Sequence, residues 1–254
     1  MRIFLEGNTD MKSLFPKPTF KVDDIISYAE LVAAENANIQ KGMNFQIKPE
    51  YSIFLMSVRK NAPYADEFDE KTGTLIYEGH NVPSNLAKDP KEVDQPITTP
   101  KGTLTENGKF FTAAQSYKMR LADEPHKVKV YEKIKDGIWC YKGFFNLVDA
   151  KIVNTGKRNV FKFYLLPVEF ISKRKQITLP HSRLIPTVVK LEVWARDKGQ
   201  CVLCGSKENL HFDHDLPYSK GGTSLTAKNV KILCMKHNLK KSDKILSFPP
   251  IFIS

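Results

Sequence analysis

The sequence has no long apolar run and few cysteines, and both shortages limit what the protein can be. No stretch of 18 or more apolar residues occurs among the 254 residues, so we expect no membrane-spanning helix. The opening residues, MRIFLEGNTDMKS, carry charges where a signal peptide needs its apolar core, so a cytoplasmic protein is expected. The composition, 41% hydrophobic and 26% charged, is that of a globular protein with room for two modest domains.

The four cysteines are unevenly placed along the chain. Cys201, Cys204 and Cys234 lie within 34 residues of one another, whereas Cys140 stands apart. In a cytosolic chain this spacing favours metal binding over disulfides. Cys201-Val-Leu-Cys204 and Cys234-Met-Lys-His237 form two ligand pairs, and four such ligands close a tetrahedral structural zinc site. The alternative is three buried thiols and a surface histidine.

Positive charge is concentrated in the last third of the chain. The protein holds 39 Lys and Arg against 28 Asp and Glu, a net charge of +11. Residues 173–254 hold 15 against 6, a net of +9, and residues 1–172 carry the remaining +2. A basic C-terminal part suits a polyanion such as nucleic acid, although a solubilising surface would have the same composition.

The apolar pattern divides the chain into four parts and predicts an α+β protein. Residues 1–50 are expected to be a helical, peripheral segment, with a helix over 22–40 that either packs on the surface or binds a partner. Residues 51–172 are expected to form a barrel-like β domain, residues 173–187 a linker, and residues 188–254 a second domain. Within these parts the sequence predicts strands at 51–58, 128–134 and 160–166, a pair of strands over 138–153 broken at Gly143, a long loop region over 80–109 and a helix over 188–199.

Several short motifs in the C-terminal part fall in a fixed order. They are IP-x-x-V, W-x-RD-x-G, the two ligand pairs, DH-x-x-P-x-S-x-GG, N-V and N-x-x-K-x-x-K. Together they resemble the zinc-containing HNH endonucleases, which have a ββα-metal fold, over about residues 183–245. His237 stands where many members carry cysteine, and zinc accepts either ligand.

This resemblance implies a role for each polar residue of the motif. Asp213 would end the first strand and, with Asn238, bind a catalytic Mg²⁺ or Mn²⁺ ion. His214 would act as the general base, and Asn229 would orient that base or its loop. The residue types suit the chemistry, because a neutral histidine can take a proton from water and a hard ion prefers oxygen ligands.

Other polar residues near this motif have open interpretations. His211 is two residues before Asp213 and could be a further ligand, but packing or DNA contact is the favoured interpretation. Asp215 could simply cap the turn. Three lysines near the end of the motif are expected to contact phosphate, with a solvated helix face as the alternative: Lys240, Lys241 and Lys244.

A second unusual cluster lies at residues 61–81, NAPYADEFDEKTGTLIYEGHN. Recognition of a flipped base needs aromatic faces for stacking and an acid that accepts from an exocyclic amine. Tyr64 and Tyr77 could supply the faces. The alternative is an acidic hairpin with two packing tyrosines. The acids that could accept from cytosine N4 are Asp66, Glu67 and Asp69.

This stretch resembles the 5-methylcytosine-binding loop of SRA (YDG) domains, which belong to the PUA-like barrels. The likeness extends over about residues 50–170, through NGKF at 107–110. Glu78 is a further candidate base-binding residue of this cluster. Many SRA sequences have Thr-Gly after the second aromatic, where this chain has Glu78-Gly79. HNVPSN then replaces the glycine-rich continuation, which bears on which modification is read.

An SRA domain joined to an HNH module is a known plan of modification-dependent, type IV-like restriction endonucleases. The combined resemblance implies an enzyme that flips 5-methylcytosine or 5-hydroxymethylcytosine out of double-stranded DNA and hydrolyses nearby phosphodiester bonds. One HNH site cuts one strand at a time, so a homodimer is an expected arrangement. Two alternatives stay open: a non-catalytic reader of modified DNA, and a nuclease for unmodified DNA or RNA.

Overall fold

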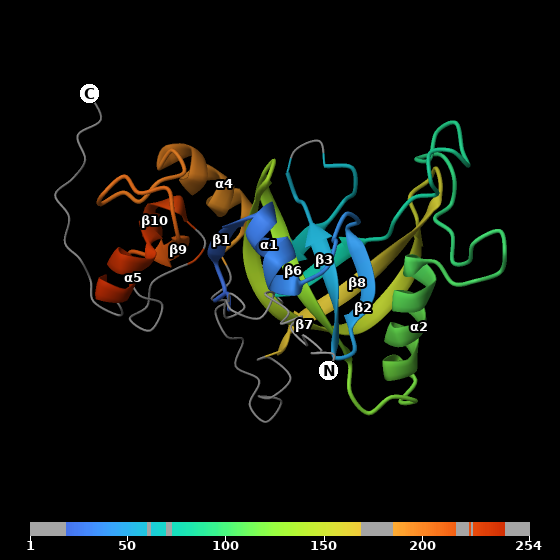
Figure 1. Ribbon diagram of the computed structural model, residues 1–254. Helices are drawn as coiled ribbons and strands as arrows, with labels where there is room; N and C mark the ends of the chain where they lie inside the picture. Colours follow the sequence, from blue (N-terminus) through green and yellow to red (C-terminus); the bar gives the residue numbers. More distant parts are fainter. Residues whose placement is uncertain are drawn as a thin grey trace, which may run out of the picture.

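The fold is a mixed α+β arrangement built on one large sheet with few helices (Figure 1). The computed structural model describes residues 19–59, 62–69, 73–168, 185–216, 224 and 226–241. None of the described helices is long and apolar enough to cross a membrane. The strands are β1 (Asp24–Ser27), β2 (Met43–Lys48), β3 (Tyr51–Met56), β4 (Glu67–Asp69), β5 (Thr74–Glu78), β6 (His126–Lys135), β7 (Ile138–Asn154), β8 (Asn159–Pro167), β9 (Leu210–His214) and β10 (Val230–Cys234). The helices are α1 (Tyr28–Glu35), α2 (Glu106–Lys118), α4 (Thr187–Arg196) and α5 (Met235–Lys241), with a 3-10 turn η3 (Ala227–Asn229).

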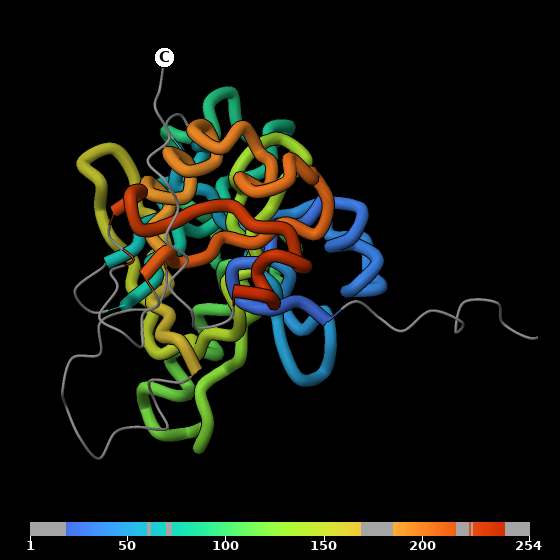
Figure 2. Tube along the Cα trace, turned by 90° about the vertical axis from the view of Figure 1, so that its left-hand side faces the viewer, coloured from blue at the N-terminus to red at the C-terminus, as the bar shows by residue number. Residues whose placement is uncertain are grey.

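The strand order joins the two ends of the chain. The main path runs β10-β9-β1-β7-β6-β3-β2, and β8, β5 and β4 branch from β7. Strands β2 to β8 curve around a core on which α2 packs, and the small module of α4, β9, β10 and α5 lies beside β1 (Figures 1 and 2). β1 is therefore the strand that connects this small module to the larger curved part.

The longest strand, β7, has two partners along one of its edges. Near its start Cys140 pairs with Ile25 of β1, and from Phe145 onward it pairs with β8. Gly143 lies between these two regions with φ of +95°, a conformation that favours glycine. The sequence predicts two strands broken at this glycine. That prediction is wrong, because one 17-residue strand continues through a shift of register against β6.

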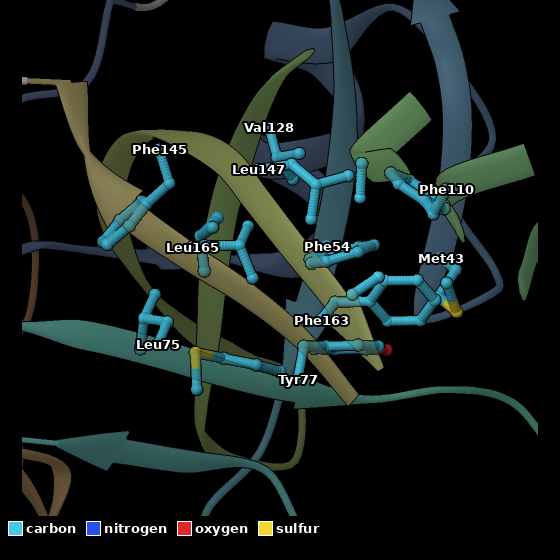
Figure 3. Packing of buried hydrophobic residues seen from close by; sticks show 14 of the residues in the cluster. Met43, Phe54, Leu75, Tyr77, Phe110, Val128, Phe145, Leu147, Phe163 and Leu165 are labelled. Carbon is cyan, nitrogen blue, oxygen red and sulfur yellow. The ribbon is translucent and has the colours of Figure 1, made fainter. Parts of the chain in front are cut away.

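The buried aromatic and aliphatic side chains of the curved part form the largest core. Phe54 on β3 stacks on Tyr77 of β5 with ring centroids 4.1 Å apart, and Phe110 of α2 packs against Phe54 at 4.5 Å (Figure 3). The opposite face of β3 and β6 carries Ile53 and Tyr131, which α1 covers. Alternation along each strand thus supplies both faces of the sheet with apolar side chains.

The helix predicted over residues 22–40 is corrected at its start. Asp24–Ser27 form strand β1, and helix α1 begins only at Tyr28. Ser27 caps the helix, since its Oγ accepts a hydrogen bond from Glu30 N–H while the Glu30 carboxylate accepts one from Ser27 N–H. Strand pairing on both sides outweighs the helical spacing of this short stretch. The domain boundaries stay predictions, although β1 (Asp24–Ser27) and β2 (Met43–Lys48) belong to the sheet.

Candidate functional site

The four predicted zinc ligands come together in the small module. Their ligand atoms all lie within 4.8 Å of one another, from Cys201, Cys204, Cys234 and His237. His237 Nδ1 is 3.3 Å from Cys234 Sγ and 3.5 Å from Cys201 Sγ. Burial pushes the pKa of the Cys201 thiol up, but backbone N–H donors and His237 outweigh it and lower the pKa to about 6. Three thiols and an imidazole at these distances fit a tetrahedral zinc ion.

Local backbone geometry explains the residues around the first ligand pair. Gly205 has φ of +69°, and its N–H donates to the Cys201 carbonyl at 2.8 Å. Gly199 has φ of +61°, and a Cβ there would come within 2.6 Å of the Trp194 ring. Asp197 Oδ2 accepts from Ile232 N–H at 2.9 Å and so ties α4 to β10. The W-x-RD-x-G motif therefore supports the module rather than forming its reactive surface.

The turn after β9 carries the predicted catalytic pair. Asp213 and His214 are the last two residues of β9, and Asp213 Oδ2 is 2.5 Å from Lys241 Nζ of α5. Lys241 is 1% exposed and also donates to the His214 carbonyl. Because Lys241 is buried, both the expected phosphate contact and the alternative of a solvated helix face are wrong for it. Asn238 precedes Lys241 by three residues, so the two residues lie on the same side of α5.

Two further residues fix the shape of this turn. Asn229 Oδ1 accepts from Leu216 N–H at 2.8 Å, and its Nδ2 donates to the Leu216 carbonyl at 3.2 Å. His214 Nε2 lies 2.8 Å from Ser224 Oγ. Asn229 comes from the η3 turn just before β10, and its two hydrogen bonds hold the chain that follows the catalytic pair. Residues 217–223 of the turn motif and Lys244 lie outside the described residues.

The structure places the neighbouring polar residues whose interpretations were open. His211 Nδ1 is 2.7 Å from Asp24 Oδ1 of β1, so its ring links β9 to the N-terminal strand. Asp215 forms an ion pair with Lys231 and donates its backbone N–H to the Asn229 carbonyl at 2.7 Å. Lys240 is exposed. His211 is thus part of the packing between modules.

A pocket of about 610 Å³ opens beside the predicted base-binding hairpin. Tyr64, Asp66 and Tyr77 line it, as does His80, which sequence reasoning missed. The Tyr64 and His80 rings stack with centroids 5.3 Å apart, and His80 Nε2 is 3.3 Å from Tyr77 Oη. Gly42 closes this end, because a Cβ there would come within 2.5 Å of Tyr77 Oη. Tyr77 is 2% exposed and stacks on Phe54, so it offers the pocket mainly its hydroxyl edge.

Asp66 is the buried acid of this pocket. Its carboxylate accepts from Ser57 N–H at 2.9 Å and from Glu78 N–H at 3.0 Å, which ties β3 to β5. Burial raises its pKa to about 7, although these backbone donors and Lys162 partly oppose the rise. Asp66 can therefore exchange its proton near neutral pH.

The position of His80 depends on helix α2. Asn107 Oδ1 accepts from His80 N–H, and Asn107 Nδ2 donates to the His80 carbonyl, both at 2.8 Å. Gly108 allows close approach, since a Cβ there would come within 2.2 Å of the Ile97 carbonyl oxygen. Burial lowers the pKa of His80 to about 4, so its ring is neutral at physiological pH. The NG pair of NGKF thus positions a pocket residue 27 positions upstream.

The remaining candidate acids face other surroundings. Glu78 is buried, 3.4 Å from Arg158 Nη2 and 3.3 Å from Lys162 Nζ, and it lines a second pocket of about 640 Å³. Glu67 is largely exposed and 3.5 Å from Lys162 Nζ. Asp69 ends β4 opposite Thr74. Among the described residues that line the first pocket, neither Glu67 nor Asp69 occurs.

No protein-family model matches this chain, and no curated protein matches it. Among solved structures it is similar to the SUVH5 SRA domain in complex with hemi-methylated CG DNA. That likeness has 22% identity and a TM-score of 0.42, and covers 60% of this chain and 92% of the other. The same domain bound to fully hydroxymethylated CG DNA matches at 18% identity, with the same TM-score and coverage. The type IV phosphorothioation-dependent restriction endonuclease ScoMcrA matches at 14% identity and a TM-score of 0.39, covering 89% of this chain and 58% of the other.

Proposed function

We propose that this protein is a modification-dependent DNA endonuclease. The curved N-terminal part reads a modified cytosine flipped out of double-stranded DNA, and the small C-terminal module hydrolyses a phosphodiester bond nearby. The observation that carries this proposal is that one molecule contains both a candidate reactive pair and a candidate base-binding pocket. The Asp213-His214 pair lies at the end of β9, next to α5, in the module that contains the Cys₃His cluster. The tyrosine-and-acid pocket lies in the curved part. The Asp213-His214 pair alone would be compatible with any metal-assisted nuclease. The pocket is what supports selectivity for modified DNA.

The reading end is proposed to hold the base through three side chains. Tyr64 supplies a stacking face, which in this structure lies against the His80 ring, so the base displaces or extends that stack. Asp66 accepts from the exocyclic amine of cytosine, and its raised pKa leaves it able to serve as acceptor or donor. The Tyr77 hydroxyl closes the inner wall. The flanking cations Lys41 and Arg59, which line the same pocket, suit the phosphates of the flipped nucleotide.

The cutting end is proposed to follow HNH chemistry. His214 accepts a proton from the attacking water, and the hydrogen bonds of Asn229 keep its loop in place. Water attacks the phosphorus, the bond to the 3′ oxygen breaks, and that oxygen leaves as a 3′ hydroxyl after protonation, while the other fragment keeps a 5′ phosphate. A divalent ion, when bound, would stabilise the negative charge that develops on the phosphate and the departing oxygen.

Carboxylate and amide oxygens suit a hard cation such as Mg²⁺, and in this structure the Asp213 carboxylate pairs with the ammonium group of Lys241. Lys241 Nζ lies 2.5 Å from the Asp213 carboxylate, so the position beside this oxygen attracts positive charge. Asn238, on the same face of α5, would add an amide oxygen next to it. An Mg²⁺ or Mn²⁺ ion held by these two residues would have to share Asp213 with Lys241 or displace it. The Cys₃His cluster would hold a separate zinc ion that stabilises the module.

One plasmid in two forms tests the proposal. The protein is incubated with DNA that carries 5-methylcytosine or 5-hydroxymethylcytosine, and with the same unmodified DNA, in Mg²⁺ or Mn²⁺. Faster cleavage of the modified DNA is expected. Equal rates would identify a nuclease that does not read modification, and cleavage of neither DNA with preserved binding would identify a non-catalytic reader.

A further inference from the structure

The boundary between the two functional parts is a continuous sheet. Ile25 of β1 pairs with Cys140 of β7 on one side and with Leu210 of β9 on the other. Backbone bonds extend this contact, since Asp23 N–H donates to the Tyr141 carbonyl at 2.8 Å and the Asp23 carbonyl accepts from Phe212 N–H at 3.2 Å. Strand β1 therefore belongs to both parts at once.

The two parts also share one hydrophobic core. Ile25, Ile134 and Cys140 from the curved part form a single buried cluster with side chains of the small module. Val193 of α4 and Ile232 of β10 in this cluster are fully buried. Interfaces between independently moving domains are more polar than obligate ones, so a shared apolar core favours one body.

A buried charge cluster lies across the same boundary. Lys190 of α4 is fully buried, with Nζ 2.7 Å from Asp23 Oδ1, 3.1 Å from Cys140 Sγ and 3.7 Å from Glu132 Oε2. Glu132 of β6 also pairs with the buried Lys142 of β7 at 2.9 Å. The positive charges of the two lysines thus balance the negative charges of Asp23 and Glu132. The α4 residue Thr187 adds a hydrogen bond to the Glu132 carboxylate.

This arrangement works only in one relative position of the two parts. Moving α4 away from β6 and β7 would take Lys190 from Asp23 and would leave Glu132 with Lys142 as its one lysine partner in this cluster. A buried charge that loses its partner is strongly unfavourable. The acids Asp23 and Glu132 come from the curved part and its joining strand, whereas Lys190 comes from the nuclease part. The cluster therefore specifies the docking geometry as well as stabilising it.

We propose that β1, the shared core and Lys190 lock the reading pocket and the nuclease turn into one rigid unit, so that DNA is cut at one fixed spacing from the modified base. This inference rests on the proposed function. Lys190 and Asp23 are positioning residues, since neither lines the pocket nor belongs to the Asp213-His214 turn. The covalent connection between Pro167 and Ile185 has no part in setting the spacing.

Lengthening that connection is the most direct test. A flexible Gly/Ser insert of about twelve residues between Pro167 and Ile185 adds a reach of roughly 20 Å, which is about six base-pair steps of a duplex. Duplexes with one modified cytosine and labelled ends are cut, and the product ends are mapped to single nucleotides. The wild type and the insertion variant are expected to cut at the same position. A cut position that shifts or spreads over several base pairs in the insertion variant would overturn the proposal.

Removing the Lys190 side chain, unlike lengthening the connection, should change where the DNA is cut. Lys190→Met is expected to spread the cut positions, while the preference for binding modified DNA stays within about twofold of the wild type. Lys118→Met is the matched control, because Lys118 forms a half-exposed ion pair with Asp149 on the curved part alone, and its cut position is expected to stay sharp. A sharp, unchanged cut position in folded Lys190→Met would remove Lys190 from the proposal.

Calorimetry of the zinc-loaded protein tests the lock without any nuclease activity. One cooperative unfolding transition is expected, and zinc chelation should destabilise the whole body. Two separate transitions, with the curved part unaffected by chelation, would refute the lock. If the wild type cuts no DNA, the proposed function fails, and calorimetry alone then decides whether the two parts are locked together.

Discussion

The raised pKa of Asp66 gives a measurable dependence of stability on pH. Folding moves this pKa from the ordinary 3.8 to about 7, mainly through burial. The folded protein therefore keeps a proton that the unfolded chain has lost. The stabilisation is complete below about pH 4 and is lost as the pH rises through about 7. At about 1.4 kcal/mol for each unit, the full effect is roughly 4 kcal/mol, of which roughly 2.5 kcal/mol is lost between pH 5 and pH 8.

The test compares the wild type with Asp66→Asn, which cannot titrate. Urea unfolding is followed at several pH values from 5 to 8 with zinc present, and the free energies of unfolding are subtracted. All other titrating groups cancel in the difference, so the wild type should lose roughly 2.5 kcal/mol relative to the variant over this range. Glu67→Gln, which removes a neighbouring exposed carboxylate, is the control and should give a flat difference.

A constant difference between the wild type and Asp66→Asn from pH 5 to 8 would refute the reasoning, since Asp66 would then be ionised throughout. The same pKa has a consequence for reading DNA. A cytosine amine that donates to Asp66 favours the charged carboxylate, so the affinity for modified DNA should fall as the pH drops below about 7. Asp66→Asn should remove this pH dependence of binding.

Four further changes test individual side chains. His214→Ala should abolish cleavage and leave the affinity for modified DNA within about twofold, as binding assays would detect; retained cleavage would exclude His214 as the base. Tyr64→Ala should lose the preference for modified over unmodified DNA, worth about 1–3 kcal/mol of stacking, while a retained preference would argue against the pocket. Lys241→Met should bind Mn²⁺ about tenfold more tightly in calorimetric titration, because the competing ammonium is gone, and weaker binding would contradict that competition. Cys204→Ser should lower the bound zinc measured by mass spectrometry and the melting temperature, and an unchanged zinc content would exclude Cys204 as a ligand.

Short sequence patterns predicted those features that depend on residues close together in the chain. The two ligand pairs are brought together as expected, because their spacing and their chemistry are both visible in the sequence. The strand around Phe163 also follows from alternating apolar residues, and the strand around Phe54 follows from a short, nearly continuous apolar run. His80 was missed because its place depends on Asn107, which no spacing rule connects to it.

The features that the sequence did not predict correctly depend on contacts between residues far apart in the chain. Asp24–Ser27 is a strand because β7 and β9 lie on either side of it, more than 110 and 180 residues away along the chain. No role for Lys190 follows from the sequence, because only the fold brings its acids, Asp23 and Glu132, beside it. Lys241 was expected on a phosphate-binding face, but it is buried against Asp213 because α5 packs onto β9.

The place of β1 between β7 and β9 affects how the small module could be moved to another protein, by engineering or by recombination. A module excised at Ile185 would leave behind the strand that covers the edge of β9, and an uncovered edge with free backbone donors and acceptors pairs with other chains. His211 would also lose Asp24. A fusion of the small module to another protein would therefore have to carry residues from the opposite end of the chain, so recombination that exchanges only contiguous segments would seldom produce one.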